Sequence, residues 1–99
     1  MPAYMIVYAS IHDRDKFLQG YAPAASRLVA EYGGKYVIRA PSAEVLEGEL
    51  DPDMSVVISE WPDKETILRF WNSPEYQEAK KLRDGVADCL VSIVETPTS

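Results

Sequence analysis

Four short apolar runs divide the chain into segments of strand type: residues 3–11 (AYMIVYASI), 35–40 (KYVIRA), 55–61 (SVVISEW) and 88–95 (DCLVSIVE). Each is too short for an independent helix and rich in β-branched or aromatic residues, a pattern typical of strands. In the runs 3–11 and 55–61, both sets of alternating side chains are apolar. These two runs therefore predict central strands that are covered on both faces.

The segment between the first two runs has helical spacing. Phe17, Tyr21, Ala25, Leu28 and Tyr32 recur along it, which predicts a helix from His12-Asp13 to about Tyr32 that ends at Gly33. Pro23 lies inside this helix, where it removes a hydrogen bond of the helix and clashes with the preceding turn. We therefore expect a kink near residues 19–22, or a later helix start.

Two more helical segments follow the run 55–61. Asp63 is placed to cap a helix whose apolar stripe contains Ile67, Phe70 and Trp71. Ser73-Pro74 then begins a new helix, with serine as N-cap and proline at the first helical position. We expect this last helix to span residues 75–84 and to end at Gly85.

The order strand, helix, strand, strand, helix, strand predicts an α+β fold of the ferredoxin-like βαββαβ type. In this fold, a four-stranded antiparallel sheet carries its helices on one face, and right-handed crossovers place the first and third strands at the centre. Residues 44–49 are expected to form a short strand or an extended arm, and residues 51–53 a surface turn. The prediction is one domain, residues 1–99.

A sheet with helices on one face leaves its other face open. We expect that face to carry several apolar residues, drawn from Met5, Val7, Val37, Val57, Trp61 and Leu90. An apolar patch of that size normally marks an interface. The pattern therefore predicts a homodimer through the helix-free sheet face.

Composition excludes several classes of function. A formal charge of −6, with no basic run, argues against a nucleic-acid surface. No apolar stretch approaches the ~20 residues that span a bilayer, and residues 1–11 do not resemble a signal peptide, so we expect a cytoplasmic protein without membrane contact. One cysteine and one histidine give poor support to a metal site, and nucleotide-binding glycine motifs are absent, so we expect no metal or cofactor.

Two residues are candidates for proton transfer. His12 ends the first strand and has an unperturbed pKa near neutrality, although His12 and Asp13 equally fit a helix cap. Glu60 ends a central strand, where burial against the helices would raise its pKa. Alternatively Glu60 forms an ion pair with an arginine, or its side chain faces the dimer interface.

Aromatic and basic residues suggest a ligand site between sheet and helices. Phenols and indoles there would contact a flat organic molecule, and arginines would bind its carboxylate, although core packing and ion pairs account equally for the same residues. The candidate ligand-binding residues are Tyr8, Tyr21, Tyr36, Arg39, Trp71, Tyr76 and Arg83. Cys89 is expected to be an inert strand residue.

The segments MPAYMIVYASIHD, EYGGKYVIRA, VLEGE, VVISEWPD and above all NSPEYQ resemble the bacterial domain-of-unknown-function 1330 family, within the dimeric α/β barrel superfamily. The resemblance covers nearly the whole chain. It implies a ferredoxin-like protomer and a barrel-forming dimer. Relatives in that superfamily include cofactor-free monooxygenases, muconolactone isomerases, haem-binding enzymes and small stress-responsive proteins, commonly with pockets between sheet and helices.

Two functional hypotheses follow. In the first, the dimer binds a small aromatic or acidic metabolite between sheet and helices, with cofactor-independent monooxygenase- or isomerase-like chemistry in which His12 or Glu60 moves a proton. In the second, the protein is a non-catalytic ligand sensor or a stress-linked structural dimer. The second hypothesis predicts a closed interior without a cavity beneath the first helix.

Overall fold

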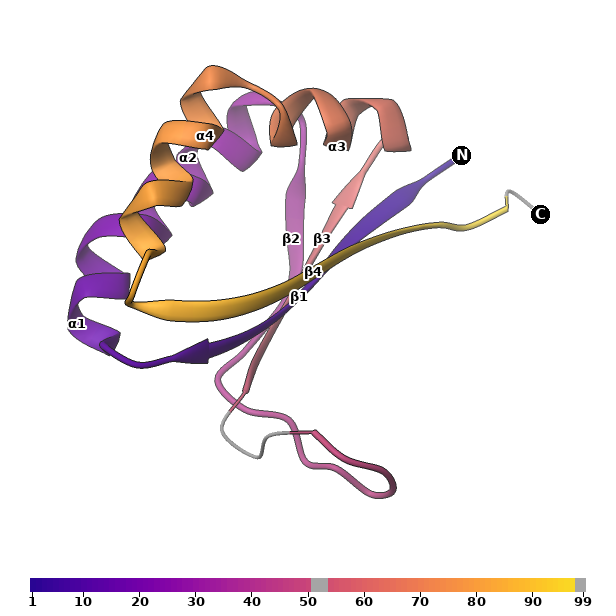
Figure 1. The fold of residues 1–99 in the computed structure, drawn as a ribbon. Helices are drawn as coiled ribbons and strands as arrows, with labels where there is room; N and C mark the ends of the chain where they lie inside the picture. Colours follow the sequence, from indigo (N-terminus) through magenta and orange to yellow (C-terminus); the bar gives the residue numbers. More distant parts are fainter. Residues whose placement is uncertain (51–53, 98–99) are drawn as a thin grey trace.

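The computed structural model describes residues 1–50 and 54–97 of the chain. The chain folds into four strands and a series of short helices (Figure 1). In order these are β1 (Ala3–Ile11), α1 (Arg14–Lys16), the π-helix η1 (Phe17–Tyr21), α2 (Ala22–Glu31), β2 (Lys35–Ala40), β3 (Ser55–Trp61), α3 (Lys64–Trp71), α4 (Pro74–Lys80), the 3₁₀ helix η2 (Lys81–Arg83) and β4 (Ala87–Glu95).

The strands form one antiparallel sheet in the order β2-β3-β1-β4, so the predicted central strands are the central strands. The helices lie together over one face of this sheet, and the sheet curves beneath them (Figure 1). The predicted ferredoxin-like α+β fold is confirmed. Within residues 1–50 and 54–97, no helix combines the length and the apolar character needed to cross a membrane.

The prediction of which side chains face away from the helices is mostly wrong. Met5 and Trp61 are buried in the core with the helices, and Val7 packs against the same core. Val57 pairs with Val7 and lines a cavity on that side. Of the predicted set, Leu90 points away from the helices, because it lies opposite Tyr8 rather than Val7.

The reason lies in the sizes of the alternating residues. Both alternating sets of β1 are apolar, so polarity does not tell them apart. The helix-facing set includes Ala3 and Ala9, and in β3 it includes Ser55 and Ser59, all four buried. Small side chains at these positions leave room for helices, whereas the larger tyrosines and isoleucines of the other set do not.

A β-bulge in β2 changes which of its residues face the helices. Tyr36 pairs with Ser59, but the next paired residue, Ile38, lies opposite Ile58, so Val37 is the extra residue. Simple alternation predicts Tyr36 and Ile38 on one face and Arg39 on the other. The bulge instead places Tyr36 and Arg39 together on the helix side, and Ile38 on the helix-free side.

The first helical segment departs from a regular α-helix where the sequence predicts a kink. Asp13 caps α1, and its carboxylate accepts a hydrogen bond from the Lys16 amide at 3.1 Å. The π-helical turn η1 then precedes Pro23, and the Ala22 amide donates to the Phe17 carbonyl five residues earlier. Since proline has no N–H to donate, this wider turn accommodates it without a clash inside the helix.

The predicted starts of the two later helices are confirmed, whereas the last helix is α-helical only as far as Lys80 and continues as the 3₁₀ helix η2 to Arg83. The carboxylate of Asp63 accepts a hydrogen bond from the Thr66 amide, and the Ser73 hydroxyl accepts one from the Tyr76 amide. Gly33 and Gly85 have positive φ, at 98° and 73°, where glycine is favoured at a helix end. Residues 41–50 form an extended arm without a strand (Figure 1), and the turn predicted at 51–53 lies outside the described residues.

Candidate functional site

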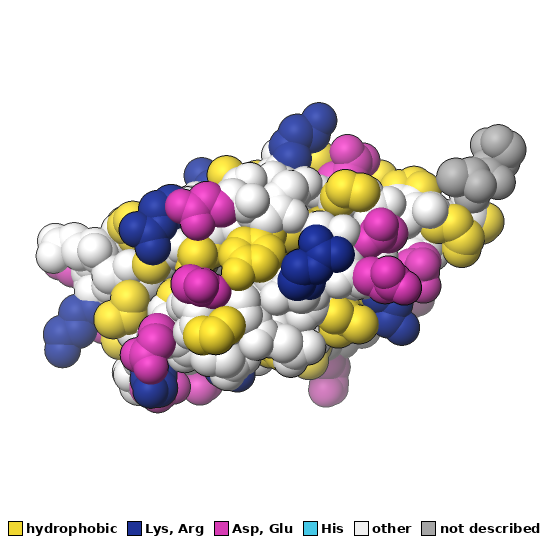
Figure 2. Space-filling model, turned by 90° about the horizontal axis from the view of Figure 1, so that it is seen from above, with side chains coloured by type: hydrophobic (Ala, Val, Ile, Leu, Met, Phe, Trp, Pro, Cys, Tyr) yellow, Lys and Arg dark blue, Asp and Glu magenta, His cyan; other side chains and the backbone are white. Residues whose placement is uncertain are grey.

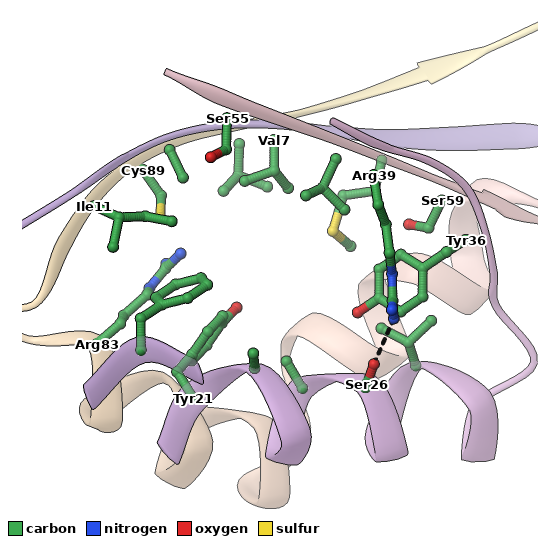
Figure 3. A pocket seen from close by; sticks show the side chains of 18 of the residues that line it. Val7, Ile11, Tyr21, Ser26, Tyr36, Arg39, Ser55, Ser59, Arg83 and Cys89 are labelled. Atoms are coloured by element: carbon green, nitrogen blue, oxygen red, sulfur yellow. Dashed lines mark hydrogen bonds between the residues drawn. The ribbon is translucent and has the colours of Figure 1, made fainter. Parts of the chain in front are cut away.

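A cavity of about 520 Å³ lies between the sheet and the helical segment that runs through η1 and α2 (Figure 3). Its roof is the helix-facing side of all four strands, and its floor is formed by η1, α2 and parts of α3, α4 and η2. The volume suits a small organic molecule. The cavity contradicts the closed interior that the non-catalytic hypothesis predicts.

Most of the cavity wall is apolar. Side chains of β1, β3 and β4 supply the roof, and aromatic and small residues of the helices supply the floor. The apolar lining includes Met5, Val7, Ala9, Ile11, Phe17, Leu18, Ala22, Ala25, Val29, Val57, Phe70, Trp71 and Val91. The small residues Ala9, Ala22 and Ala25 leave space that larger side chains would fill, and the π-helical turn places Phe17 and Tyr21 along the floor.

Two phenols and a guanidinium lie at one end of this apolar cavity. The hydroxyls of Tyr21 and Tyr76 are hydrogen-bonded to each other at 2.7 Å. The guanidinium carbon of Arg83 lies 5.4 Å from the centre of the Tyr21 ring. The Nη1 atom of Arg83 is buried, and no group of residues 1–50 and 54–97 accepts a hydrogen bond from it.

Burial keeps the two phenols in their neutral form. Burial, followed by the neighbouring Tyr76, raises the pKa of Tyr21 far above its usual value. Burial likewise raises the pKa of Tyr76. Each neutral hydroxyl carries one proton, and one of the two protons forms the Tyr21–Tyr76 bond. The other proton is available to a ligand oxygen.

The other end of the cavity contains Arg39, Tyr36 and Ser26. Arg39 extends from β2 towards α2, where its Nη2 donates to the Ser26 hydroxyl at 2.6 Å (Figure 3). Its guanidinium carbon lies 3.9 Å above the ring of Tyr36. Among the described residues, neither Arg39 nor Arg83 forms the ion pair that the sequence left open as an alternative.

The charge of the cavity wall is opposite to the charge of the chain. The chain has 16 acidic and 10 basic residues. In the part of the chain that the structure describes, the cavity wall includes Arg14, Arg39 and Arg83 but no aspartate or glutamate. An apolar cavity with cationic groups and no carboxylate suits a ligand with an apolar body and an anionic oxygen.

Six of the seven predicted ligand-binding residues line this cavity: Tyr21, Tyr36, Arg39, Trp71, Tyr76 and Arg83. Tyr8 does not, because it belongs to the helix-free set of β1 and lies opposite Val56 and Leu90. The placement of Tyr8 between sheet and helices is therefore wrong. Trp71 and Tyr76 pack against each other with ring centres 5.1 Å apart, so they form part of both the core and the cavity wall.

The two candidates for proton transfer lie outside the cavity. His12 is exposed, and its Nε2 lies 2.8 Å from the carboxylate of Asp88 near the start of β4. Glu60 is on the helix-free face and accepts a hydrogen bond from the Tyr4 hydroxyl at 2.8 Å, not from an arginine. The suggestion that Glu60 faces away from the helices agrees with this position. Catalysis by either residue stays a prediction.

Sequence reasoning missed several residues of the wall, including Arg14, Phe17, Ser26 and Cys89. Phe17 lies on the predicted helical stripe with Tyr21 and Ala25, so the spacing could have marked it as a wall residue, whereas Ser26 directly follows Ala25 and is not on that stripe. Arg14 could not be identified, because its position depends on the direction in which the chain turns after β1. No group of three or more metal-binding side chains occurs among residues 1–50 and 54–97.

Fold and cavity together define a small ferredoxin-like protein with an apolar cavity between its sheet and its helices. The chain belongs to the family described as domain of unknown function DUF1330, whose model matches residues 2–97. A search of curated proteins found no match. The resemblance drawn from the sequence is thereby confirmed, and the family description assigns no activity.

Solved structures with the same fold are distant in sequence. A protein of unknown function from Rhodopseudomonas palustris aligns with a TM-score of 0.78 and 20% identity, over 99% of this chain and 84% of that chain. A dimeric ferredoxin-like protein of unknown function from a Jannaschia species aligns with a TM-score of 0.75 and 14% identity, over 97% and 100%. SnoaB, a cofactor-independent oxygenase from Streptomyces nogalater, aligns with a TM-score of 0.70 and 12% identity, over 99% and 95%. These similarities establish the fold alone.

Proposed function

We propose that the cavity binds a small, flat, largely apolar molecule that carries an anionic or enolic oxygen. The carrying observation is the cationic side chain of Arg83 in the wall of an apolar cavity that, among the described residues, has no carboxylate to balance it. An anionic ligand oxygen in this cavity would balance the charge of the guanidinium and accept a charge-assisted hydrogen bond from it. The free phenol proton of the Tyr21–Tyr76 pair would donate a second hydrogen bond to the same oxygen.

Calorimetric titration with naphthalene-2-carboxylate tests this proposal. We expect binding to the wild-type protein, and roughly ten- to hundredfold weaker binding to Arg83→Gln, since a hydrogen bond to a charged group contributes about 1.5–3 kcal/mol. The control is Arg27→Gln, which removes the same charge from an exposed position on α2 outside the cavity. A melting curve of each variant checks that it is folded. Equal affinity of wild type and Arg83→Gln, or no binding to the wild type, would refute the proposal.

A second candidate is cofactor-independent oxygenation of such a ligand. SnoaB, which has this fold, is a cofactor-independent oxygenase. In the present chain, Arg83 would stabilise an enolate at the buried end of the cavity, and an electron-rich enolate reduces O₂ without a cofactor. With anthrone as probe, the CH₂ group loses two hydrogens, one oxygen atom becomes the new carbonyl, and the other leaves as water.

The oxygenase candidate is tested on the same variants by measuring oxygen consumption and product formation. With the wild type and with Arg27→Gln, we expect one mole of oxygen to be consumed for each mole of anthraquinone formed. With Arg83→Gln, we expect both oxygen consumption and anthraquinone formation to be lost. If anthrone binds but oxygen uptake stays at the level without protein, the site is a binding site only. His12→Ala is included because a role for His12 in moving the proton is still a prediction, although His12 lies outside the cavity.

We also propose that the protein is a homodimer through the helix-free face of the sheet. The related Jannaschia protein is a dimeric ferredoxin-like protein. In the present chain, apolar side chains of this face are half-buried or exposed in the protomer: Ile6, Tyr8, Ile38, Val56, Ile58, Leu90 and Val94. The helix side looks different, because charged side chains of both signs are spread over it (Figure 2). Apolar surface of this extent favours association.

A further inference from the structure

The cavity has two cationic ends separated by an apolar middle. Figure 3 shows Arg83 beside Tyr21 at one end, Arg39 beside Tyr36 and Ser26 at the other, and Val7 on the roof between them. A ligand with a single acidic group would engage one of these ends. A ligand with two acidic groups would engage both at once.

The separation of the two ends follows from the helical floor. Tyr21 contacts Arg83 through its ring, and Ser26 is the hydrogen-bond partner of Arg39. Both belong to one continuous helical run, and at the α-helical rise of 1.5 Å per residue they lie about 7.5 Å apart along its axis. Tyr21 and Ser26 therefore mark two different points along the cavity, and a ligand that reaches both arginines must be elongated.

The two arginines differ in what they have available for a ligand. Arg83 has a buried Nη1 atom without an acceptor among the described residues, so its end is the inner end. Arg39 is exposed, which makes its end the solvent side of the cavity. One hydrogen bond joins it to Ser26, and a guanidinium has five N–H donors in a planar fork. Arg39 therefore has further N–H groups that can donate to a carboxylate while its guanidinium stays in contact with the Tyr36 ring and the Ser26 hydroxyl.

We propose that the cavity selects elongated apolar molecules with an anionic group at each end, bound by Arg83 at the inner end and by Arg39 at the outer end. This inference rests on the proposed ligand site and adds its substrate class. Arg39 is then the residue that distinguishes diacids from monoacids. Because Arg39 is exposed, solvent reduces its contribution to the binding free energy. An exposed ion pair contributes up to about 1 kcal/mol, so the expected preference for a diacid is roughly fivefold.

The test compares matched ligands on matched variants by calorimetric titration. The probes are naphthalene-2-carboxylate against naphthalene-2,6-dicarboxylate, and biphenyl-4-carboxylate against biphenyl-4,4′-dicarboxylate, so that two lengths of diacid are compared. In the wild type we expect one diacid to bind roughly fivefold tighter than its monoacid. Arg39→Gln should remove that ratio, because it weakens the binding of the diacid more than the binding of the monoacid. Arg39→Lys should retain part of the ratio, and Arg27→Gln all of it.

The outcomes separate this inference from the proposed ligand site. If monoacids bind through Arg83 but neither diacid binds tighter, the two-ended selectivity is refuted and the ligand site stands. If the diacid preference survives Arg39→Gln and disappears in Arg14→Gln, the second end is misassigned and the proposal for Arg39 fails. If neither monoacid nor diacid binds to the wild type, the proposed ligand site itself fails. A ratio that decreases with ionic strength supports an ionic contact at the exposed end.

Discussion

At the scale of single residues, the pair Tyr21–Tyr76 belongs both to the packed interior and to the cavity wall. The two rings meet edge to face with centres 6.5 Å apart, and their hydroxyls are joined at 2.7 Å. The same hydroxyls border the cavity next to Arg83. Because burial raises the pKa of both phenols, they remain hydrogen-bond donors at any physiological pH.

The raised pKa of Tyr21 predicts a loss of stability in alkali. Below the unfolded pKa of 10.0, the phenol is protonated in both states, so it adds no pH dependence. Above it, the unfolded chain releases the proton and the folded protein retains it, so the free energy of unfolding falls as pH rises. Urea denaturation at about pH 8 and about pH 11 should show a smaller fall for Tyr21→Phe than for wild type, by at most about 1.4 kcal/mol per pH unit.

The control for that experiment is Tyr8→Phe, which removes one phenol from the opposite face of the sheet. At about pH 8, Tyr21→Phe should itself be less stable by about 1 kcal/mol, since one buried hydrogen bond is lost. Parallel losses of stability for wild type and Tyr21→Phe would show that the phenol of Tyr21 also titrates in the folded protein near its usual value.

Individual residues also show where sequence reasoning stopped. The aromatic and arginine pattern identified Tyr21, Tyr76 and Arg83 because residue type and helical spacing carried enough information. Tyr8 was misplaced because both faces of β1 are apolar, and alternation alone does not say which face meets the helices. The set that meets the helices includes the small residues Ala3 and Ala9, which are both buried.

At the scale of elements, the local sequence pattern predicted where each strand begins and ends better than it predicted which side chains face the helices. The runs predicted at 3–11, 35–40 and 55–61 coincide with β1, β2 and β3. The bulge in β2 was not predicted, because it depends on pairing with β3 rather than on the residues of β2 themselves. It matters for the site, since it places Arg39 and Tyr36 on the same side of the sheet.

The junction between α2 and β2 gives a prediction at this scale. A Cβ atom on Gly34 would lie 2.5 Å from the Trp61 ring, which is 1% exposed and packed on Phe70. Gly34→Ala must therefore displace a buried indole, and we expect a loss of about 1–3 kcal/mol in the free energy of unfolding. Thermal and urea denaturation measure it.

Gly20→Ala is the matched control for this substitution. A Cβ atom there meets no atom within 4 Å, and Gly20 lies inside the π-helical turn. Alanine should be neutral or stabilising by up to about 1 kcal/mol, because it lowers the conformational entropy of the unfolded chain. Equal destabilisation by the two substitutions would mean that contact with Trp61 is not what requires glycine at position 34.

At the scale of the whole molecule, helices and cavity occupy one side of the sheet, and the other side remains open. The order of elements in the sequence predicted this arrangement, and the structure confirms it (Figure 1). All four strands contribute side chains to this open side of the sheet. Its apolar residues favour a second copy of the chain as the cover.

Leu90 provides the test of that cover. Leu90 lies on β4 opposite Tyr8, it is 62% exposed, and its side chain is on the helix-free face. Light scattering on the wild type should give twice the protomer mass of 11.1 kDa. Leu90→Asp should shift the mass towards that of one protomer, because a face-to-face dimer would bury an unpaired carboxylate. Leu82→Asp, at a leucine 49% exposed on η2 outside the sheet, should remain dimeric.

A wild type that stays a single protomer at micromolar concentration, or a Leu90→Asp variant that stays fully dimeric, would contradict assembly through this face.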